Sequence, residues 1–381
     1  MSATIGIYAD GHVDARGPGG FNPSENLPQN AVEALKSLAK TVDSFNDKGA
    51  DLLLVAGDLF DTGKPTPEIV ARVDSLFSRL DTTRVVLLDG NHDQQGVLSG
   101  HRTAIESYFR DRPWCVDAKS SPGVVEVDGL MIATLPWVRV SSSNALGATN
   151  EALERYVDEM ASAIRPGTPS LLVGHLTVAE CSFDSQRRGS EATMVTSTLE
   201  ASIPTAVLDE GPWALARLGH IHKRQQLSEK TGYVGSPYKV SFGEIADSKG
   251  IDLVTLSDDN TASVEFLKFD VRELVKIDLT DPACSASSFA ARQGDIVRLV
   301  ANSHTSDQAE ALARSFIAAG ASAHIHRVPD ELAAIKREAQ YSTEMAPADA
   351  LSAYLERKGI DEEKRPLIIA AFSDVSAACH H

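Results

Sequence analysis

The chain has 381 residues, of which 43% are hydrophobic and 23% charged, and its formal net charge is −17. This composition is ordinary for a folded globular protein, and at roughly 150 residues per domain the length predicts two or three domains. The negative charge argues against a protein that coats nucleic acid by bulk electrostatics, and no run of 18 apolar residues predicts a membrane-spanning helix.

Residues 1–270 alternate short apolar runs with helical patterns, which is typical of a layered α/β domain. Apolar residues at three- and four-residue intervals predict helices at Asn30–Asn46 and Pro67–Leu80. The apolar runs predict strands at Thr4–Ala9, Leu52–Ala56, Arg84–Leu88, Leu130–Leu135, Leu171–Val173 and Leu215–Leu218.

The pattern changes after residue 270. A βαβαβ unit is predicted over residues 271–330, and residues 331–381 read as helical, with helices around Ala348–Lys358 and Glu363–Val375. The elements expected in the unit are strands Leu274–Leu279, Asp295–Ala301 and Ala321–Val328 and helices Ser285–Arg292 and Ser306–Ala319. We therefore expect three parts: 1–270, 271–330 and 331–381.

Asp, Asn and His residues follow five of the predicted strands at the point where each strand ends. Ligands in layered α/β proteins bind at the carboxyl ends of strands, where loops converge, so these residues predict one shared site. Glycine precedes the key residue in four of the motifs, which permits sharp turns and close backbone approach. The motifs are Asp10-Gly11-His12, Gly57-Asp58-Leu59-Phe60-Asp61, Gly90-Asn91-His92-Asp93, Gly174-His175 and Gly219-His220-Ile221-His222.

The residue types at these strand ends indicate metal chemistry. Imidazole, carboxylate and amide oxygen without thiolate suit divalent ions such as Mn²⁺, Fe²⁺, Zn²⁺ or Mg²⁺. Seven such residues exceed the needs of a single ion, so we expect two ions that share a bridging carboxylate. Two adjacent divalent ions clamp a phosphoryl group and activate a water for in-line attack.

This set of motifs resembles the calcineurin-like metallophosphoesterase superfamily and, within it, the SbcD-type nucleases of DNA double-strand-break repair. The phrases Gly57–Pro65 and Tyr233–Tyr238, the latter leading to Ser241–Glu244, are similar to segments of those nucleases. The resemblance covers most of residues 1–260 and extends more loosely beyond them. It implies an α/β fold: a layered metallophosphoesterase β-sandwich flanked by helices, a small α+β capping domain and C-terminal helices.

The resemblance also implies roles for individual residues. One ion would be held by Asp10, His12, Asp58 and His222, and the second by Asp58, Asn91, His175 and His220. His92 would not bind metal but would stabilise the transition state and help to protonate the leaving oxygen. Asp93 could orient that imidazole. Asp61 either supports the site or caps the next helix.

The implied activity is a manganese-dependent 3′→5′ exonuclease on duplex DNA with endonuclease activity on single strands. The unit 271–330 would shape the DNA groove, and the terminal helices could dock on an SbcC-like ATPase of the SMC family. A homodimer is left open. Two alternatives remain: a stand-alone metallophosphoesterase for small phosphodiesters or monoesters, and a silent scaffold that retains the fold.

Basic residues near the motifs could position a polynucleotide through phosphate contacts, or could be solvated loop charges. They are Arg16, Lys64, Arg187, Arg188, Lys223, Arg224 and Lys239. The pair His324 and His326 copies the spacing of His220 and His222, but no Gly or Asp accompanies it, so we expect a role without metal.

The cysteines are scattered along the chain, and the N-terminus has no basic region before its first apolar run. Both features favour a reduced, cytoplasmic protein.

Overall fold

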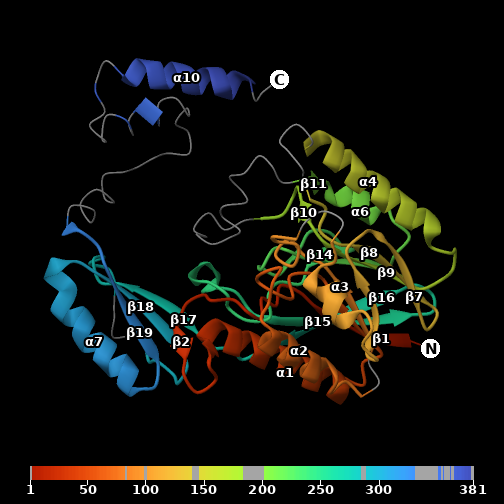
Figure 1. Ribbon diagram of the computed structural model, residues 1–381, viewed down its shortest axis with the longest axis horizontal. Helices are drawn as coiled ribbons and strands as arrows, with labels where there is room; N and C mark the ends of the chain where they lie inside the picture. The colour runs from red at the N-terminus through yellow and green to blue at the C-terminus, as the bar shows by residue number, and fades with distance from the viewer. Residues whose placement is uncertain are drawn as a thin grey trace.

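Two six-stranded sheets form the centre of the molecule, and helices cover their outer faces (Figure 1). The predicted class, a layered α/β sandwich flanked by helices, is confirmed. The computed structural model describes residues 2–81, 84–97, 101–139, 146–182, 201–284, 289–330, 351–352, 355, 361 and 364–378.

Each large sheet has a parallel centre; the second sheet has an antiparallel strand at both edges, whereas the first has antiparallel strands at one edge only. The first runs in the order β16 (Ala262–Lys268), β15 (Gly250–Ser257), β1 (Ser2–Tyr8), β4 (Leu52–Val55), β5 (Arg84–Leu88) and β6 (Cys115–Lys119). The second runs in the order β13 (Gln225–Gln226), β14 (Thr231–Tyr233), β12 (Leu215–Gly219), β9 (Ser170–His175), β8 (Leu130–Leu135) and β7 (Gly123–Val127).

The apolar runs are continuous because the central strands are buried on both faces. In β4, Leu52 and Leu54 pack between the two sheets, whereas Leu53 and Val55 face the covering helices. The core between the sheets places these β4 residues with Leu171 and Val173 of β9 in one cluster. Side chains of both sheets therefore fix the distance between the strand ends that carry the motifs.

Helices form the outer layers. The first sheet is covered by α1 (Gln29–Lys48), α2 (Pro67–Phe77) and α3 (Ala104–Phe109), and the second by α4 (Leu146–Ala163) and α6 (Thr205–Asp209). Thr66 caps α2 by accepting a hydrogen bond from the main chain of Ile69, and Pro67 occupies the first helical turn, where its missing N–H costs nothing.

A separate three-stranded parallel sheet follows, with the order β17 (Leu274–Asp278), β18 (Ile296–Ala301) and β19 (Ser322–Arg327). Helix α7 (Ser306–Ala318) covers one of its faces. The helix predicted at 285–292 is wrong over Phe289–Arg292, which is irregular; residues 285–288 lie outside the described residues. The Asp295 carboxylate accepts hydrogen bonds from the main-chain N–H groups of Glu273 and Arg292, and Gly294 has a positive φ, so a turn forms in place of a helix.

Shorter elements complete the described chain. The pairs are β2 (Phe21–Asn22) with β3 (Leu27–Pro28) and β10 (Thr177–Val178) with β11 (Ser202–Ile203); the 3₁₀ turns are η2 (Phe242–Glu244) and η4 (Ser303–Thr305). The second predicted terminal helix is observed as α10 (Arg365–Ala378), and most of 348–358 lies outside the described residues. Among the helices of the described chain, none combines the length and apolar character needed to cross a bilayer.

Leu54 is fully buried between the sheets, so we expect Leu54→Ala to lower the free energy of unfolding by about 2–5 kcal/mol through lost burial and a residual cavity. Urea titration followed by circular dichroism measures this loss. The matched control is Leu367→Ala, because that leucine is 71% exposed and its truncation should change stability by less than about 0.5 kcal/mol. Equal unfolding midpoints for the two variants would contradict the sandwich core.

Candidate metal centre

Five loops meet at the carboxyl ends of β1, β4, β5, β9 and β12, and main-chain hydrogen bonds join them. Asp10 N–H donates to the carbonyl of Gly57 at 3.1 Å, and His12 N–H donates to the carbonyl of Asp58 at 3.0 Å. The Asp10 carboxylate accepts from His220 N–H at 2.7 Å, and the Asp58 carboxylate accepts from His92 N–H at 2.8 Å. The loops that carry the five motifs therefore lie together, as the positions of the strand ends predicted.

Backbone strain is concentrated at this site. Among the described non-glycine residues with positive φ are Asp10 (53°), His12 (41°), Asp58 (50°) and His220 (95°). Such conformations cost of order 1–3 kcal/mol each and persist where the surrounding structure over-determines them. Here the loops bend sharply so that their side chains turn inward.

The glycines of the motifs allow the close approach that was predicted for them. A Cβ atom at Gly57, which has a φ of 85°, would overlap the His175 ring. A Cβ atom at Gly90 would overlap the Asp58 carboxylate. Any side chain at either position would therefore push a candidate ligand out of place.

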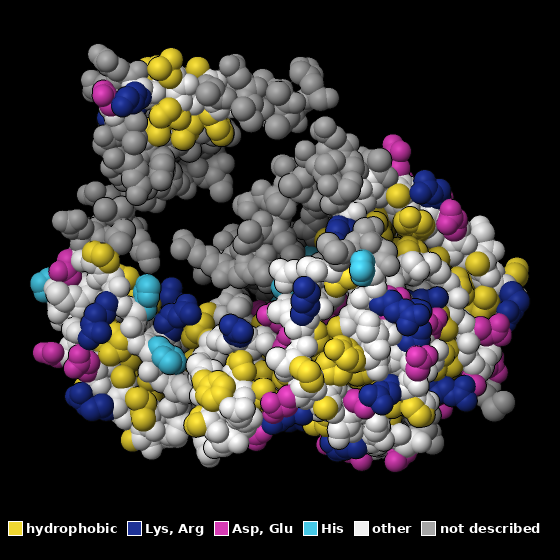
Figure 2. Space-filling view, in the orientation of Figure 1, with side chains coloured by type: hydrophobic (Ala, Val, Ile, Leu, Met, Phe, Trp, Pro, Cys, Tyr) yellow, Lys and Arg dark blue, Asp and Glu magenta, His cyan; other side chains and the backbone are white. Residues whose placement is uncertain are grey.

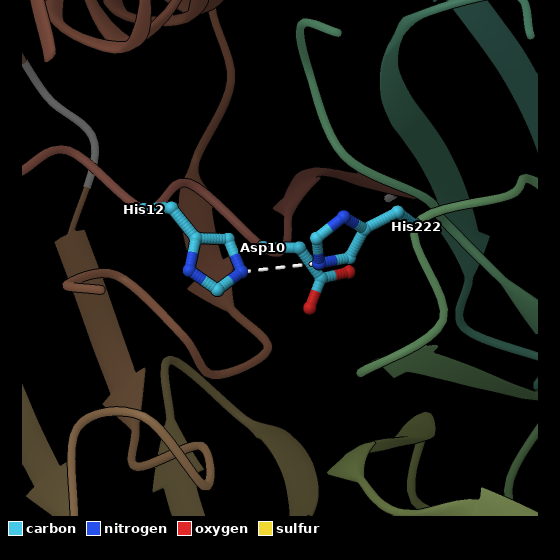
Figure 3. A group of neighbouring side chains, drawn as sticks. All are labelled: Asp10, His12 and His222. Carbon is cyan, nitrogen blue, oxygen red and sulfur yellow. Dashed lines mark hydrogen bonds between the residues drawn. The ribbon is translucent and has the colours of Figure 1, made fainter. Parts of the chain in front are cut away.

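One cluster joins Asp10, His12 and His222, which point toward one another from two different sheets (Figure 3). The Nε2 atoms of His12 and His222 lie 3.1 Å apart. The other ring nitrogen of each is engaged: His12 Nδ1 lies 3.0 Å from Asp61 Oδ1, and His222 Nδ1 lies 3.0 Å from Glu244 Oε1. Because a carboxylate only accepts, each Nδ1 donates, and the Nε2 atoms of both rings face the same point.

The second cluster joins Asn91, His175 and His220. His175 Nδ1 donates to the carbonyl of Ala56 at 2.8 Å, which leaves Nε2 as a lone-pair donor to a metal. That Nε2 atom lies 3.0 Å from Asn91 Oδ1, which is also 3.1 Å from His220 Nδ1. These three side chains thus face one point from β5, β9 and β12.

Asp58 lies between the two clusters. Its Oδ2 atom is 3.7 Å from His12 Nε2 in the first cluster and 3.4 Å from His175 Nε2 in the second. Asp10 Oδ2 is buried and has no hydrogen-bond partner within the described chain. The unpartnered Asp10 Oδ2 atom and the convergence of imidazole, carboxylate and amide oxygen fit two divalent ions.

The electrostatics of the centre also favour positive charge. Burial acts to raise the pKa of Asp58, but His175 and the neighbouring imidazoles outweigh burial, so the pKa lies far below its ordinary value. Burial acts to lower the pKa of His175, but Asp58 outweighs burial and raises the pKa to about 9. A proton and a metal ion therefore compete for the same negative potential.

His92 stands beside the first cluster with a side chain that is 16% exposed. Its ring meets that of His12 edge-on, with the centroids 4.7 Å apart. Its Nδ1 donates to the main-chain carbonyl of Asp61 at 2.9 Å. Asp61 thus holds two imidazoles, His92 through its carbonyl and His12 through its carboxylate, and the cap of α2 is Thr66 instead.

The orienting role expected of Asp93 is not observed. Its buried carboxylate accepts main-chain hydrogen bonds from Phe60 at 2.9 Å and Gly90 at 2.8 Å, so it ties two loops together beneath the site. Burial and the nearby Asp58 charge raise the pKa of Asp93 to about 7. The main-chain carbonyl of Asp61, 2.9 Å from His92 Nδ1, takes the orienting role.

Two residues at the site were not predicted. Glu244 is buried and orients His222, and it also pairs with the buried Lys249 at 2.6 Å. Burial acts to raise the pKa of Glu244, but Lys249 and His222 outweigh it and hold the pKa far below its ordinary range. Trp137 lies against His220, with ring centroids 5.0 Å apart. The similarity of segment Ser241–Glu244 to the nucleases could have indicated Glu244, whereas no sequence pattern indicated Trp137.

The candidate nucleic-acid residues divide into three groups. Arg16 and Lys64 are exposed and Lys223 is half-buried, while Arg187 and Arg188 lie outside the described residues. Arg224 is bound to the buried Asp252 at 3.0 Å and stacks on Phe266, so it is a structural residue. Lys239 is 4% exposed and bonds the carbonyl of Ile245 and the carboxylate of Glu273. The prediction of phosphate contacts is therefore wrong for Lys239, because it is buried and its ammonium is engaged by Ile245 and Glu273. For Arg224, whose side chain is 31% exposed, phosphate contact stays a prediction.

Comparison with known proteins gives a family match and distant solved structures. A dimetal phosphatase from Danio rerio is 12% identical, with 69% of this chain and 98% of that chain covered and a TM-score of 0.38. The protein TT1561 of Thermus thermophilus is 13% identical, with 70% of this chain and 99% of that chain covered and a TM-score of 0.34. The model of the family described as calcineurin-like phosphoesterase matches residues 3–224, a span that holds all seven candidate ligands. The chain belongs to the calcineurin-like phosphoesterase family, whose members are metal-dependent phosphoesterases.

Proposed function

We propose that this protein is a two-metal DNA phosphodiesterase of the SbcD type, a 3′→5′ exonuclease on duplex DNA and an endonuclease on single strands. The observation that carries the phosphodiesterase chemistry is the position of Asp58 Oδ2 between one imidazole of each cluster. The DNA substrate is supported by the nuclease-like phrases of the sequence and by the additional sheet β17–β18–β19, which follows the matched residues 3–224.

The described side chains would hold the two ions, orient the metal-binding imidazoles and fix the loops of the site. Asp10, His12, Asp58 and His222 would hold one ion, and Asp58, Asn91, His175 and His220 the other. Such ions, with Mn²⁺ the first to test, supply Lewis acidity to the phosphoryl group. Asp61 and Glu244 keep the rings of His12 and His222 in the tautomer that presents Nε2. Asp10 and Asp58 accept main-chain hydrogen bonds that lock the loops, so little reorganisation is needed when substrate binds.

His92 is suited to proton transfer. Its Nδ1 is engaged by the carbonyl of Asp61, so Nε2 is the atom that would carry a proton to the leaving sugar oxygen. The ring is partly exposed, whereas the candidate ligands His12 and His175 are almost fully buried. This difference in exposure supports a role toward substrate for His92 and a metal-holding role for the buried imidazoles.

The terminal helix is the proposed attachment point for an SbcC-like ATPase. Helix α10 exposes Leu367 (71%), Ile368 (39%) and Phe372 (38%), and Figure 2 shows hydrophobic side chains along it. An exposed apolar face on a short helix fits a groove or a coiled coil of a partner. We also propose that residues 271–330 act as the capping domain.

The deciding experiment titrates Mn²⁺ against cleavage of end-labelled duplex DNA, with bis-p-nitrophenyl phosphate as the small substrate in parallel. The proposal expects metal-dependent degradation of the duplex that a candidate ATPase partner stimulates. Hydrolysis of the small diester with the duplex left intact would establish the stand-alone phosphoesterase instead. If neither substrate were turned over at any metal concentration, the result would support the alternative of a silent scaffold that retains the fold.

We expect His92→Ala to lower the rate constant for DNA cleavage by about 10²–10⁴-fold because the proton donor is lost. The bound metal, measured by elemental analysis after desalting, should stay at the wild-type stoichiometry. Asp58→Asn is the comparison variant, and it should lose bound metal as well as activity. Cleavage at the wild-type rate in His92→Ala protein would refute the assigned role.

We expect Glu244→Gln to lower metal affinity by about 10–100-fold, because His222 loses the charged acceptor that orients its ring. Isothermal titration with Mn²⁺ measures the change. Asp247→Asn is the matched control, since Asp247 pairs with the same lysine, Lys249, at 3.4 Å. If both variants weakened metal binding equally, the effect would come from the loss of the ion pair with Lys249. That result would refute the orienting role proposed for Glu244.

A further inference from the structure

Lys249 is a lysine buried beside the metal centre. Its side chain is 1% exposed, and it directly precedes β15. A lysine is rarely buried unless acceptors surround its ammonium, because removing the charge from water is costly. The acceptors here are Glu244 Oε2 at 2.6 Å, Ser236 Oγ at 2.7 Å, the main-chain carbonyl of His222 at 3.0 Å and the Asp247 carboxylate at 3.4 Å. The ammonium therefore contacts both a candidate metal ligand and the carboxylate that orients that ligand.

The main chain of His222 is held by two donors. Its carbonyl accepts hydrogen bonds from the Lys249 ammonium at 3.0 Å and from Ser236 N–H at 3.1 Å. Gly235 permits this approach, since it has a φ of 80° and a Cβ atom there would lie only 2.9 Å from the same carbonyl oxygen. The segment Tyr233–Tyr238 therefore lies against the loop that carries His222 and fixes its backbone together with Lys249.

The ring of His222 is held through the Glu244 carboxylate. Glu244 Oε1 lies 3.0 Å from His222 Nδ1, whereas Oε2 accepts from the Lys249 ammonium at 2.6 Å and from Val240 N–H at 3.1 Å. Because one carboxylate oxygen is fixed by an ammonium and a main-chain N–H, the other cannot swing away from the imidazole. Lys249 thus acts on the ring as well as on the backbone of the same ligand.

Lys249 also joins the two large sheets at the edge that carries the motifs. It precedes β15 of the first sheet, whereas His222 follows β12 of the second. Strand β15 runs antiparallel to β1, so the start of β15 lies near the carboxyl end of β1, which leads to Asp10 and His12. The ammonium therefore connects His222 to the sheet from which the other two members of its cluster come.

The second cluster is oriented by other groups. His175 Nδ1 donates to the carbonyl of Ala56, and His220 N–H donates to the carboxylate of Asp10. Among the described residues, the four acceptors around Lys249 include no member of this cluster. A change at Lys249 should therefore affect the site of one ion and spare the other.

We propose that Lys249 is a positioning residue of the metal centre, which fixes the backbone and the ring of His222 and so sets the affinity for the ion shared with Asp10 and His12. The inference rests on the proposed two-metal function and deepens it, because it gives the two ion sites different determinants. Loss of the ammonium should weaken binding of one ion by about 10–100-fold, the usual effect of removing a group that orients a metal ligand, and leave the other ion unchanged.

The test measures Mn²⁺ binding to the full chain by isothermal titration and by electron paramagnetic resonance, which distinguishes a spin-coupled pair of ions from isolated ions. Wild-type protein should bind two ions and show the coupled spectrum. Lys249→Met should bind one ion at the wild-type affinity and the other about 10–100-fold more weakly, so the coupled spectrum should appear only at correspondingly higher Mn²⁺ concentration. Circular dichroism checks that each variant is folded.

A second variant keeps the inference testable if Lys249→Met does not fold. That substitution leaves the Glu244 carboxylate buried without its cation, whereas Lys249→Met/Glu244→Gln leaves neither charge of the pair. The double variant should bind the affected ion more weakly than Glu244→Gln does, because the carbonyl of His222 also loses a donor.

The matched control is Lys239→Met. Lys239 is buried like Lys249, with 4% exposed, and both lysines lie five positions from Glu244 in the sequence. The Lys239 ammonium, however, bonds the carbonyl of Ile245 and the carboxylate of Glu273. The control removes the same charge from a buried position and should retain the wild-type affinity for both ions.

The outcomes separate this inference from the proposed function. Selective weakening of one ion by loss of the Lys249 ammonium, with Lys239→Met at the wild-type values, supports the positioning role. Wild-type affinity for both ions in folded Lys249→Met, a double variant no weaker than Glu244→Gln, or an equal loss in the control overturns the role and leaves the two-metal centre standing. Wild-type protein that binds no Mn²⁺ overturns both. DNA does not enter the measurement, so failure of wild-type protein to cleave duplex DNA contradicts the nuclease alone.

Discussion

The structure depends on a buried group of imidazole nitrogens and carboxylate and amide oxygens that converge from five loops. The Nδ1 atoms of His12 and His222 both donate hydrogen bonds to carboxylates, and the Nδ1 atom of His175 donates to a main-chain carbonyl. The Nε2 atoms of His12 and His222 then face each other, and the Nε2 atom of His175 faces Asp58 and Asn91. Positive charge stabilises such a buried group, and His175 supplies it when protonated, whereas divalent ions would supply it when bound.

The strain in the backbone is confined to the loops of the site, and the buried strands of the two sheets supply the stability that offsets it. Candidate ligands such as Asp10 and His220 occupy strained backbone conformations, and their loops leave the sheets within one or two residues of a strand end. The strands beneath them are buried on both faces, between the sheets on one side and under the helices on the other. A rigid sandwich can therefore hold strained loops that would relax if they were isolated.

The sequence predicted what depends on local pattern. Apolar runs marked the strands, and the polar residues at their ends fell at one site because parallel strands end at the same edge. Contacts between distant segments were beyond that reasoning. His12 and His222 are 210 positions apart, and the partners that orient them, Asp61 and Glu244, come from different loops. A carboxylate in a loop looks the same in sequence whether it faces water, a helix end or an imidazole.

The inability to predict contacts between distant segments also explains the predictions that were wrong. Asp93 follows His92 directly, and adjacency suggested contact, yet adjacent residues in a tight turn diverge, and the carboxylate points to the main chain of Phe60. Arg224 and Lys239 looked like free loop charges because Asp252 and Glu273, their partners, lie 28 and 34 positions away. In a chain of net charge −17, the pairing of basic side chains with carboxylates also determines how few basic charges remain free at the surface. Lys239 is buried and Arg224 is paired with a buried carboxylate, so any affinity for a polyanion would depend on other exposed basic groups and on cations that the carboxylates of the centre would hold.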